Sequence, residues 1–405
     1  MVEPSSLSLR LPAGIRDFAP GAAAARRQIA ETLIGVFERW GYAQVITPAF
    51  EYEAVLALGL GSDGRASALR FVEPSSGQIL ALRPDITPQV ARLMATRFAE
   101  EQGPIRMCYE GPVFRYDPAA RAQKELIQAG VELAGIEGAD GDVEAISIAL
   151  DALAAAGLPD VTIDLAHPGL ARAVIQEVGL PEGLEQAFRA RMAKRDRAGV
   201  AEILLQASAD KAVVDFASLL PSLSGGPEVL DKAEASAPGA DVRESLAYLR
   251  TVVDRLAKRG VAQGRVHVDL GEVRGFDYYT GVRFQGFVHG AADAIVAGGR
   301  YDALMGRYGR PRPAVGFAID VELTAGALEE QQGRMPIGPR SGTGGVLVVG
   351  DSVAAEAEAH RLRQLGKRAA VAGSLDRNDA KAYAQRWGYS EILLAGKKNE
   401  TLSVD

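Results

Sequence analysis

Strand patterns in this sequence of 405 residues lie on both sides of a long segment that carries only helical patterns. From about residue 168 to residue 262, apolar residues recur at helical spacing, with breaks at Pro181, Pro221 and Gly225-Gly226-Pro227. The runs before and after this segment are short and apolar or alternating, which is typical of strands. The sequence therefore predicts an α+β core, a mixed and mostly antiparallel sheet with helices, interrupted by a helical insert.

The expected elements of the core follow from these periods. Before the insert we expect helices over 21–40, from Thr87-Pro88 onward and over 143–156, and strands over 43–47, 69–73, 78–83, 105–116, 124–134 and 161–165. In the second helix, Thr87 is the expected N-cap and Pro88 the first helical residue. After the insert we expect strands over 265–270, 282–288 and 293–297, and helices over 300–305 and 319–329.

The end of the chain has a different character. Residues 331–343 are rich in Gly, Pro, Arg and Ser, which predicts a linker. Beyond it, strand patterns at 346–349, 369–372 and 391–394 alternate with helical patterns at 354–365 and 376–387, which predicts a small parallel, doubly wound unit. We expect a core domain over residues 1–330, including the insert at about 168–262, and a small α/β domain over 343–405.

Charge and cysteine usage narrow the classes of function. The net charge is -7, and a protein built mainly to grip nucleic acid would usually be more basic. The single cysteine, Cys108, cannot form an internal disulfide, which fits a reducing cytoplasm, and its apolar surroundings predict a buried structural thiol. The four scattered histidines show no metal-ligand spacing, so we expect neither a metal site nor a cofactor. We also expect no signal peptide and no membrane span.

A glycine-rich stretch in the first half matches the spacing of dinucleotide-binding loops. Gly59-Leu60-Gly61-Ser62-Asp63-Gly64 has the G-x-G-x-x-G pattern. Such a loop needs a strand before it and a helix after it. Here residues 53–60 have a helical pattern and a hairpin follows, so we expect a mobile loop and no dinucleotide site.

The strand predicted at 124–134 carries polar residues on one face. Alternate side chains of a strand share a face, which groups Gln128, Gly130 and Glu132 opposite an apolar set. An amide and a carboxylate beside a glycine form a polar floor that a ligand can approach closely, and the carboxylate would attract an ammonium group or an imidazole N–H. A simply solvated face explains the pattern equally well.

Arg115 belongs to the same predicted hairpin as this polar face. Its guanidinium suits a carboxylate or a phosphate, although an ordinary surface ion pair is the more common role for one arginine. At the predicted helix start, Asp85 and Thr87 fit helix capping, and they fit the recognition of a ligand amine equally well.

Two further glycine-flanked stretches lie after the insert. In Arg274-Gly275-Phe276-Asp277-Tyr278-Tyr279-Thr280-Gly281, an arginine and two tyrosines could line a pocket, and a hairpin packed with aromatic side chains is the plainer alternative. In Gly298-Gly299-Arg300-Tyr301-Asp302, the glycine pair permits a tight turn or a close ligand, while Tyr301 and Asp302 could simply begin a helix.

Together these stretches resemble the core of class II aminoacyl-tRNA synthetases, and more narrowly histidyl-tRNA synthetase. Residues 273–281 and 297–302 are similar to that family's two histidine-recognition motifs. Phe114-Arg115 with the 128–132 strand resembles its motif 2, and residues 42–50 resemble the dimer-forming motif 1. Gly316-Phe317-Ala318-Ile319 begins like motif 3. The resemblance covers roughly residues 10–325 and implies a class II synthetase-like fold with a site for free histidine.

The resemblance also assigns expected roles within that site. Asp85, Thr87 and Glu132 would meet the α-amino group or the imidazole of histidine. Gln128 and Arg274 would lie near its carboxylate or amide end, and Arg115 would face the carboxylate, or a phosphate if ATP were present. Tyr279 and Tyr301 would enclose and hydrogen-bond the ring, and Tyr278 also belongs to the expected histidine-binding set.

Departures from the synthetase pattern affect the ATP and tRNA machinery. Leu323 stands where motif 3 carries an arginine that clasps the ATP phosphates, and leucine cannot offset their charge. The motif 2 loop, residues 116–121, is short and lacks the usual acidic-then-basic pair, and Asp85 replaces a longer glutamate. The tail has too few strand patterns for a complete anticodon-binding domain, so we interpret it as a reduced remnant.

A chain that keeps the histidine pocket but lacks the ATP-binding and tRNA-binding features resembles the family of ATP phosphoribosyltransferase regulatory subunits. That resemblance implies a chain with no catalytic residues, built on a homodimer and joined to the short-form catalytic subunit in a hetero-oligomer, with a hetero-octamer expected. It implies feedback inhibition of histidine biosynthesis by L-histidine, and it implies no tRNA partner and no membrane. Such feedback requires a coupling free energy, typically about 1–3 kcal/mol.

Two alternatives remain on the sequence alone. An active histidyl-tRNA synthetase with degenerate motifs would catalyse histidine-dependent exchange of pyrophosphate into ATP. A synthetase-like sensor of uncharged tRNA would bind tRNA tightly and in a salt-sensitive way, which the acidic balance of the chain disfavours.

Overall fold

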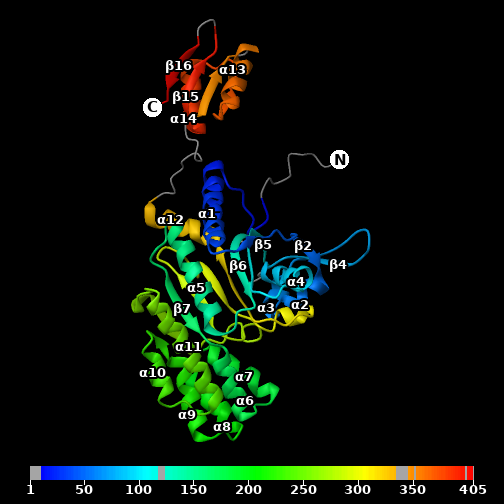
Figure 1. The fold of residues 1–405 in the computed structure, drawn as a ribbon, viewed down its shortest axis with the longest axis vertical. Coiled ribbons are helices and arrows are strands. Elements are labelled where there is room, and N and C mark those ends of the chain that lie inside the picture. Colours follow the sequence, from blue (N-terminus) through cyan, green and yellow to red (C-terminus); the bar gives the residue numbers. More distant parts are fainter. Residues whose placement is uncertain (1–10, 117–123, 334–344, 351–352, 397–398, 405) are drawn as a thin grey trace. The chain divides into compact units, whose positions relative to one another are not determined.

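The structure is a computed structural model that describes residues 11–116, 124–333, 345–350, 353–396 and 399–404 (Figure 1). The described residues group into two compact units. The larger unit holds the residues up to Asp17 and Gln28–Gly333, and the smaller unit holds Phe18–Arg27 and the residues after Gly333. None of the described helices is long and apolar enough to cross a bilayer.

A nine-stranded sheet forms the centre of the larger unit. Its strands, in spatial order, are β1 (Ala43–Gln44), β5 (Ile105–Phe114), β6 (Glu125–Ala134), β12 (Ala314–Asp320), β11 (Val296–Arg300), β10 (Arg283–Phe287), β7 (Thr162–Ala166), β9 (Val266–Asp269) and β8 (Ser224–Gly225). Neighbouring strands are antiparallel except at β1–β5 and β7–β9. The mixed, mostly antiparallel sheet predicted from the sequence is therefore confirmed, and strands from both sides of the insert build it.

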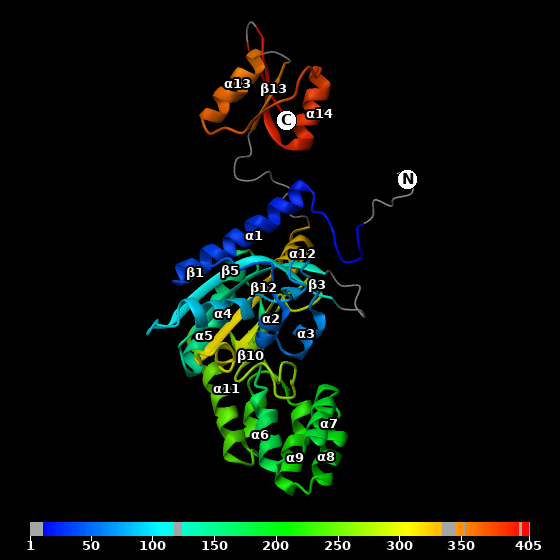
Figure 2. The same cartoon turned by 90° about the vertical axis from the view of Figure 1, so that its right-hand side faces the viewer.

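Helices cover both faces of this sheet. Helices α5 (Gly138–Ala155) and α12 (Val321–Gln332) pack against β6 and β12, on the face where Ala129, Val131 and Leu133 are buried. Helix α4 (Thr87–Arg97) lies on the other face of β6 (Figure 2). Because both faces of β6 are covered, its polar residues are enclosed and not solvated. Helix α1 runs from Pro20 to Arg39, as the periodicity predicts.

A small three-stranded sheet extends from this core. It consists of β2 (Phe50–Tyr52), β4 (Ile79–Leu82) and β3 (Arg70–Val72), and the β3–β4 hairpin is the one predicted. Helix α2 (Glu53–Gly59) occupies the helical pattern before the glycine-rich stretch. The expected mobile loop is wrong in part, because Ser62–Ser67 form a short helix, α3, directly after Gly61.

The inserted segment forms a bundle at one end of the larger unit (Figures 1 and 2). Its helices are α6 (Gly169–Val178), α7 (Glu182–Ala193), α8 (Arg197–Gln206), α9 (Lys211–Leu219), α10 (Val229–Glu234) and α11 (Ala240–Lys258), with short 3-10 turns η2 (Leu220–Ser222) and η3 (Gln263–Arg265). The all-helical pattern is confirmed except for β8, two residues that pair with β9 at the edge of the sheet.

The smaller unit contains a four-stranded sheet. Strands β14 (Ala369–Val371), β13 (Gly345–Val349) and β15 (Tyr389–Leu394) are parallel, with helices α13 (Val353–Gln364) and α14 (Arg377–Trp387) between them. These match the predicted elements. A fourth strand, β16 (Glu400–Ser403), pairs antiparallel with β15 and was not predicted.

Two local predictions near the pocket are wrong. Arg300–Met305 is not a helix: Arg300 is the last residue of β11, and the chain turns before a 3-10 helix, η4 (Met305–Tyr308). The Arg300 side chain is fixed by Asp142 and Asp302, which holds the backbone in the sheet. Strand β12 was not predicted at all, because its glycine interrupts the apolar alternation.

Candidate ligand-binding site

A cavity of about 620 Å³ opens on the α4 face of the large sheet. It lies over β6, β11 and β12, between the start of α4 and the loop that joins β9 to β10. Most of the residues expected to bind a ligand line it: Asp85, Thr87, Arg115, Gln128, Tyr278, Tyr279 and Tyr301. The fold therefore brings together segments that lie more than two hundred residues apart in the chain.

Glu132 lies beneath Thr87 and Tyr301 and is the most deeply buried charge among the predicted site residues. Only 3% of its surface is exposed, so the alternative of a solvated face is wrong. Its Oε1 accepts hydrogen bonds from the Thr87 hydroxyl at 2.6 Å and the Tyr109 hydroxyl at 3.2 Å. Burial raises the pKa of the Glu132 carboxyl well above its usual range, and the nearby Asp85 charge adds to the effect.

Thr87 acts differently from its predicted role as an N-cap. Its hydroxyl donates to Glu132, and it is already the first helical residue of α4. The N-cap residue is Ile86, and the preceding Asp85 accepts at Oδ1 from the backbone N–H of Ile86 at 2.7 Å and of Thr87 at 3.4 Å. This contact leaves the other oxygen of Asp85 beside the cavity that the residue lines.

Glycines on two adjacent strands make room for the Glu132 carboxylate. Gly316 of β12 pairs with Glu132 in register, and a Cβ at Gly316 would overlap both the Glu132 carboxylate and the Tyr301 hydroxyl. A Cβ at Gly130 would lie 2.6 Å from the Tyr109 hydroxyl. The Glu132 carboxylate and the Tyr109 hydroxyl therefore occupy space left by missing side chains, at Gly316 and Gly130 respectively.

Three tyrosines form one wall of the cavity. The Tyr278 ring meets the Tyr279 ring edge-on with centroids 5.1 Å apart, and it lies 5.5 Å from the Tyr301 ring. Burial raises the pKa of Tyr279 to about 12, so its hydroxyl stays a hydrogen-bond donor at neutral pH.

Several buried polar atoms around the cavity have no hydrogen-bond partner among the described residues. They are Gln128 Oε1, Glu132 Oε2, the Tyr278 hydroxyl and the Tyr301 hydroxyl. An unpaired buried polar atom costs about 1–3 kcal/mol, so native proteins rarely leave several together. This clustering is typical of a site whose ligand supplies the missing partners.

The charges around the cavity are mainly negative. Four lining residues carry carboxylates: Asp85, Asp293, Asp320 and Glu322. Arg115 is the only cationic side chain among the described lining residues, and its Nε donates to the Pro84 carbonyl at 2.8 Å. Leu323 also lines the cavity, and by the resemblance it stands where motif 3 of the synthetases carries an arginine. The short motif 2 loop falls largely within residues 117–123, outside the described residues.

Arg274 and Glu132 are the two predicted site residues that do not line this cavity, and Glu132 lies beneath the lining residues Thr87 and Tyr301. The Arg274 guanidinium pairs with Glu272, with Nε 2.8 Å from Oε2, and it borders a neighbouring cavity of about 890 Å³. That second cavity lies between the 273–279 loop and residues of α7, including Arg189. Asp85, Arg115, Tyr278 and Tyr279 line both cavities, so the two adjoin.

Tyr109 belongs to the site and was missed by the sequence analysis. Its ring packs in the apolar cluster under α4, while its hydroxyl reaches Glu132. The register of the β5–β6 hairpin places it opposite Gly130, one residue from the pairing that symmetric folding of the predicted strands 105–116 and 124–134 would give, so the sequence did not bring the Tyr109 hydroxyl to the site.

Comparison with known proteins gives the family. The family model described as histidyl-tRNA synthetase matches residues 14–323. A relative from Moorella thermoacetica named ATP phosphoribosyltransferase regulatory subunit is 36% identical over 387 residues, covering 95% of this chain and 97% of the relative. A relative of the same name from Geobacter sulfurreducens is 40% identical over 322 residues, covering 79% of this chain and 73% of the relative.

The solved structures agree with this relationship. A crystal structure from Bacillus halodurans, described as an ATP phosphoribosyltransferase regulatory subunit/histidyl-tRNA synthetase, superposes with a TM-score of 0.80 at 25% identity, covering 98% of this chain and all of the other. Histidyl-tRNA synthetase from Nostoc superposes with a TM-score of 0.73 at 19% identity, which confirms the class II synthetase-like fold. The chain therefore belongs to the family of ATP phosphoribosyltransferase regulatory subunits, which share the fold of histidyl-tRNA synthetase.

Proposed function

We propose that this chain is the non-catalytic regulatory subunit of ATP phosphoribosyltransferase and that it binds L-histidine in the cavity over β6, β11 and β12. The observation that carries the proposal is the cluster of unpaired buried polar atoms at Gln128, Glu132, Tyr278 and Tyr301. A ligand with several donors and acceptors would satisfy them together.

Histidine has the groups that this cavity requires. Its ammonium and imidazole N–H groups are donors for the Glu132 and Asp85 carboxylates, and the Tyr278 and Tyr301 hydroxyls can pair with the ring. The carboxylate of histidine suits Arg115, the guanidinium on the lining. Arg274 would act from the adjoining cavity, behind its ion pair with Glu272.

The balance of charges supports regulation and not aminoacylation. A triphosphate in this cavity would meet the carboxylates of Asp293 and Asp320 and the apolar side chain of Leu323, with only Arg115 to offset its charge among the described lining residues. The synthetase alternative therefore has an electrostatic barrier. It predicts histidine-dependent exchange of pyrophosphate into ATP, and we expect no exchange.

The partner in this proposal is the short-form catalytic subunit, and the names of the relatives support a regulatory subunit that works with a catalytic one. We place the assembly in the cytoplasm, with a hetero-octamer as the expected stoichiometry and no role for tRNA. Histidine would inhibit by binding one state of the complex more tightly than another, with a coupling free energy of about 1–3 kcal/mol.

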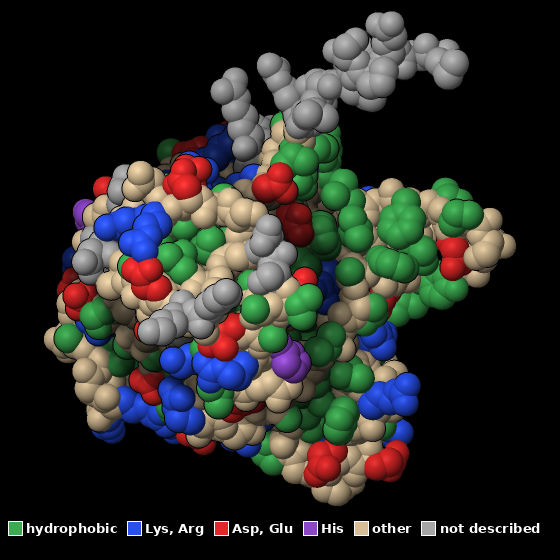
Figure 3. Space-filling model, turned by 90° about the horizontal axis from the view of Figure 1, so that it is seen from above, with side chains coloured by type: hydrophobic (Ala, Val, Ile, Leu, Met, Phe, Trp, Pro, Cys, Tyr) green, Lys and Arg blue, Asp and Glu red, His purple; other side chains and the backbone are tan. Residues whose placement is uncertain are grey.

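An exposed apolar face supports a homodimer at the core of that assembly. Phe50, Tyr52 and Phe71 lie on one face of the β2–β4–β3 sheet and are 50%, 43% and 40% exposed. Figure 3 shows apolar side chains gathered on the arm that projects to the right. Because contiguous exposed apolar surface usually marks an interface, we propose that a second copy of the chain covers this face.

The C-terminal domain, residues 343–405, is in this proposal a reduced remnant of an anticodon-binding domain, and residues 1–330 form the histidine-binding core. The described part of the C-terminal domain has a four-stranded sheet and two helices.

The test is to mix the purified chain with a short-form catalytic subunit. Phosphoribosyl transfer should appear or rise on mixing, and added histidine should suppress it. If the two chains do not co-purify and the activity responds neither to this chain nor to histidine, the proposed function is wrong.

A further inference from the structure

One arginine of the helical insert holds the loop that carries the tyrosine wall. Arg172 of α6 donates from Nη2 to the carbonyl oxygen of Phe276 at 2.6 Å and to that of Tyr279 at 3.1 Å. Arg172 forms no ion pair with a carboxylate of the described residues; burial lowers its pKa, and the charges of Asp277 and Glu185 act on it in the opposite direction. A half-buried guanidinium that donates to two backbone carbonyls fixes the path of the chain between them.

The same loop is gripped by a second arginine from α7. The guanidinium carbons of Arg172 and Arg189 lie 4.9 Å and 4.7 Å from the centroid of the Phe276 ring, so both cations contact this one side chain. Arg189 also pairs with Asp277, with Nη1 3.0 Å from Oδ1. Phe276 lines the adjoining cavity of about 890 Å³ and not the ligand cavity, while Tyr278 and Tyr279, two and three residues later, line both.

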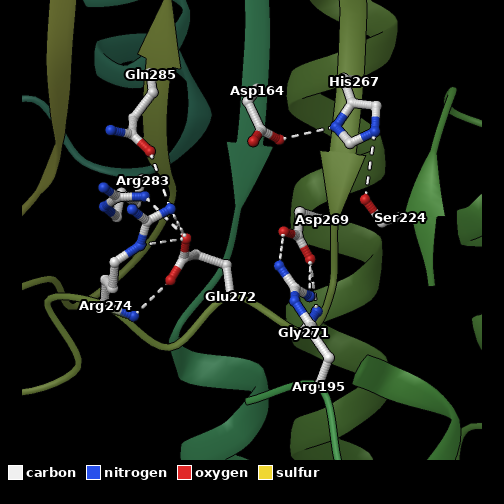
Figure 4. Close-up of polar contacts among 10 residues, drawn as sticks. All are labelled: Asp164, Arg195, Ser224, His267, Asp269, Gly271, Glu272, Arg274, Arg283 and Gln285. Carbon is white, nitrogen blue, oxygen red and sulfur yellow. Dashed lines mark hydrogen bonds and ion pairs between the residues drawn. The ribbon is translucent and has the colours of Figure 1, made fainter. Parts of the chain in front are cut away.

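The start of the loop is anchored to the insert as well (Figure 4). Arg195, in the turn between α7 and α8, forms two hydrogen bonds with the carboxylate of Asp269, which also accepts from the Gly271 N–H at 3.0 Å. Arg195 has a φ of 58°, a conformation that non-glycine residues hold only when their surroundings impose it. Glu272 then pairs with Arg274 and Arg283 on the core side.

The loop itself is shaped to depend on these contacts. Gly275 has a φ of 72°, and a Cβ there would collide with the Tyr279 ring. The backbone N–H groups of Tyr278 and Tyr279 both donate to the Gly275 carbonyl, and the turn joins the sheet only at Thr280, whose N–H donates to the Arg300 carbonyl of β11 at 2.7 Å. The two tyrosine rings pack on the core, while the carbonyls of Phe276 and Tyr279 are held by the Arg172 side chain, so the backbone path of the turn depends on Arg172.

We infer that Arg172 is a positioning residue of the ligand pocket, and that through Arg172, with Arg189, the helical insert is coupled to occupation of that pocket. A ligand that orders Tyr278 and Tyr279 also orders the carbonyls that Arg172 holds, and reciprocity requires the insert to respond. This inference rests on the proposed function, because it takes histidine as the ligand, and it gives the insert a regulatory role that the sequence alone did not indicate.

The experiment compares hydrogen exchange and calorimetry on the full chain with and without saturating L-histidine. In the wild type, histidine should slow exchange in the 275–281 loop and also in α6 and α7. Arg172→Ala should raise the dissociation constant for histidine about tenfold, as expected if the ordered loop falls to about a tenth of the population. At saturating histidine, this variant should still protect the loop but lose the protection of α6 and α7.

Three further variants make the result decisive. Arg243→Ala, at an exposed arginine of α11, should behave as the wild type. Arg172→Lys keeps the charge with a single donor group and should restore only part of the affinity. If Arg172→Ala does not fold, Arg189→Ala takes its place in the test. This variant leaves the backbone contacts of Arg172 intact and should weaken the histidine-dependent protection of α6 and α7.

Two outcomes would overturn this inference and leave the proposed function intact. One is histidine binding by the wild type with protection confined to the loop, and the other is wild-type affinity and remote protection in Arg172→Ala. If the wild-type chain binds no histidine, the proposed function itself fails and this inference falls with it.

Discussion

At the scale of single residues, the ligand-free pocket carries an unfavourable charge. Glu132 is buried with one oxygen satisfied by Thr87 and Tyr109 and the other unpaired. Its folded pKa is raised, so the folded state holds the proton more readily than the unfolded chain does. The stability of the free protein therefore falls as the pH rises from the ordinary pKa of a glutamate toward the raised value.

Glu132→Gln should separate binding from stability. The amide removes the buried charge, so the thermal midpoint of the ligand-free protein should rise by roughly 2 °C or more at neutral pH, given that such a site costs about 1 kcal/mol or more. Histidine binding should be lost, because the ammonium or imidazole loses its anion. Differential scanning calorimetry and titration calorimetry measure both, with Glu110→Gln, exposed on β5, as the control. A lower midpoint with unchanged affinity would show that Glu132 is purely structural.

His167 gives a second pH-dependent prediction. Burial lowers the pKa of His167 to about 4, and its Nδ1 has no partner among the described residues. The unfolded chain takes up a proton near the ordinary pKa of about 6.5, while the folded state does not, so folding stability should decline as the pH falls from about 6.5 to about 4. Across this range, denaturant unfolding should show a smaller decline in the free energy of unfolding for His167→Gln than for the wild type. His289→Gln, at an exposed histidine, should decline as the wild type does. Equal slopes in all three proteins would contradict the assignment.

At the scale of elements, the pocket depends on close approach of β6 and β12. Gly316→Ala should abolish histidine binding, because its Cβ would overlap the Glu132 carboxylate and the Tyr301 hydroxyl. It should also destabilise the fold by about 1–3 kcal/mol, typical of overpacking. Gly326→Ala in α12 is the matched control: its Cβ meets nothing within 4 Å, so helix propensity should stabilise the fold by roughly 0.5–1 kcal/mol. Urea unfolding with titration calorimetry checks both variants, and normal binding by Gly316→Ala would show that the pocket lies elsewhere.

The elements also show where the sequence was sufficient. Periodicity alone located α1, α5, the β5–β6 hairpin and the three parallel strands of the smaller unit, since each has a regular pattern of apolar residues. The polar face of β6 was recognised, but its burial was left open, because burial depends on α4 and β12 packing over it. Arg300 was assigned to a helix because nothing local reveals Asp142, its partner 158 residues away. The hydroxyl of Thr87 was assigned to a cap for the same reason.

At the scale of the whole molecule, the site is assembled across the insert. Asp85, Gln128 and Glu132 come from one side of it and Tyr278, Tyr301 and Leu323 from the other. The resemblance to known motifs predicted that these residues form one site. Their spacing in the sequence alone could not predict this. Arg172 and Tyr109 were missed because their roles lie in single polar atoms that reach across elements.

The proposed homodimer can be tested through the apolar face of the small sheet. Phe71→Glu should shift the chain from dimer to monomer in sedimentation velocity, because a charge cannot be buried there without a partner. Leu205→Glu is the matched control, since Leu205 is a 63% exposed leucine at the end of α8, outside this face. A Phe71→Glu protein that remains dimeric would place the interface elsewhere.

The most direct test of the account is a calorimetric titration of the purified chain with L-histidine, followed by a titration with ATP and Mg²⁺. The account predicts saturable binding of one histidine per chain, and loss of that binding in Glu132→Gln. It predicts no binding heat from ATP in the cavity. Two results would contradict the account. One is the absence of binding heat with histidine; the other is ATP binding in the presence of histidine that disappears when Asp320 or Arg115 is changed.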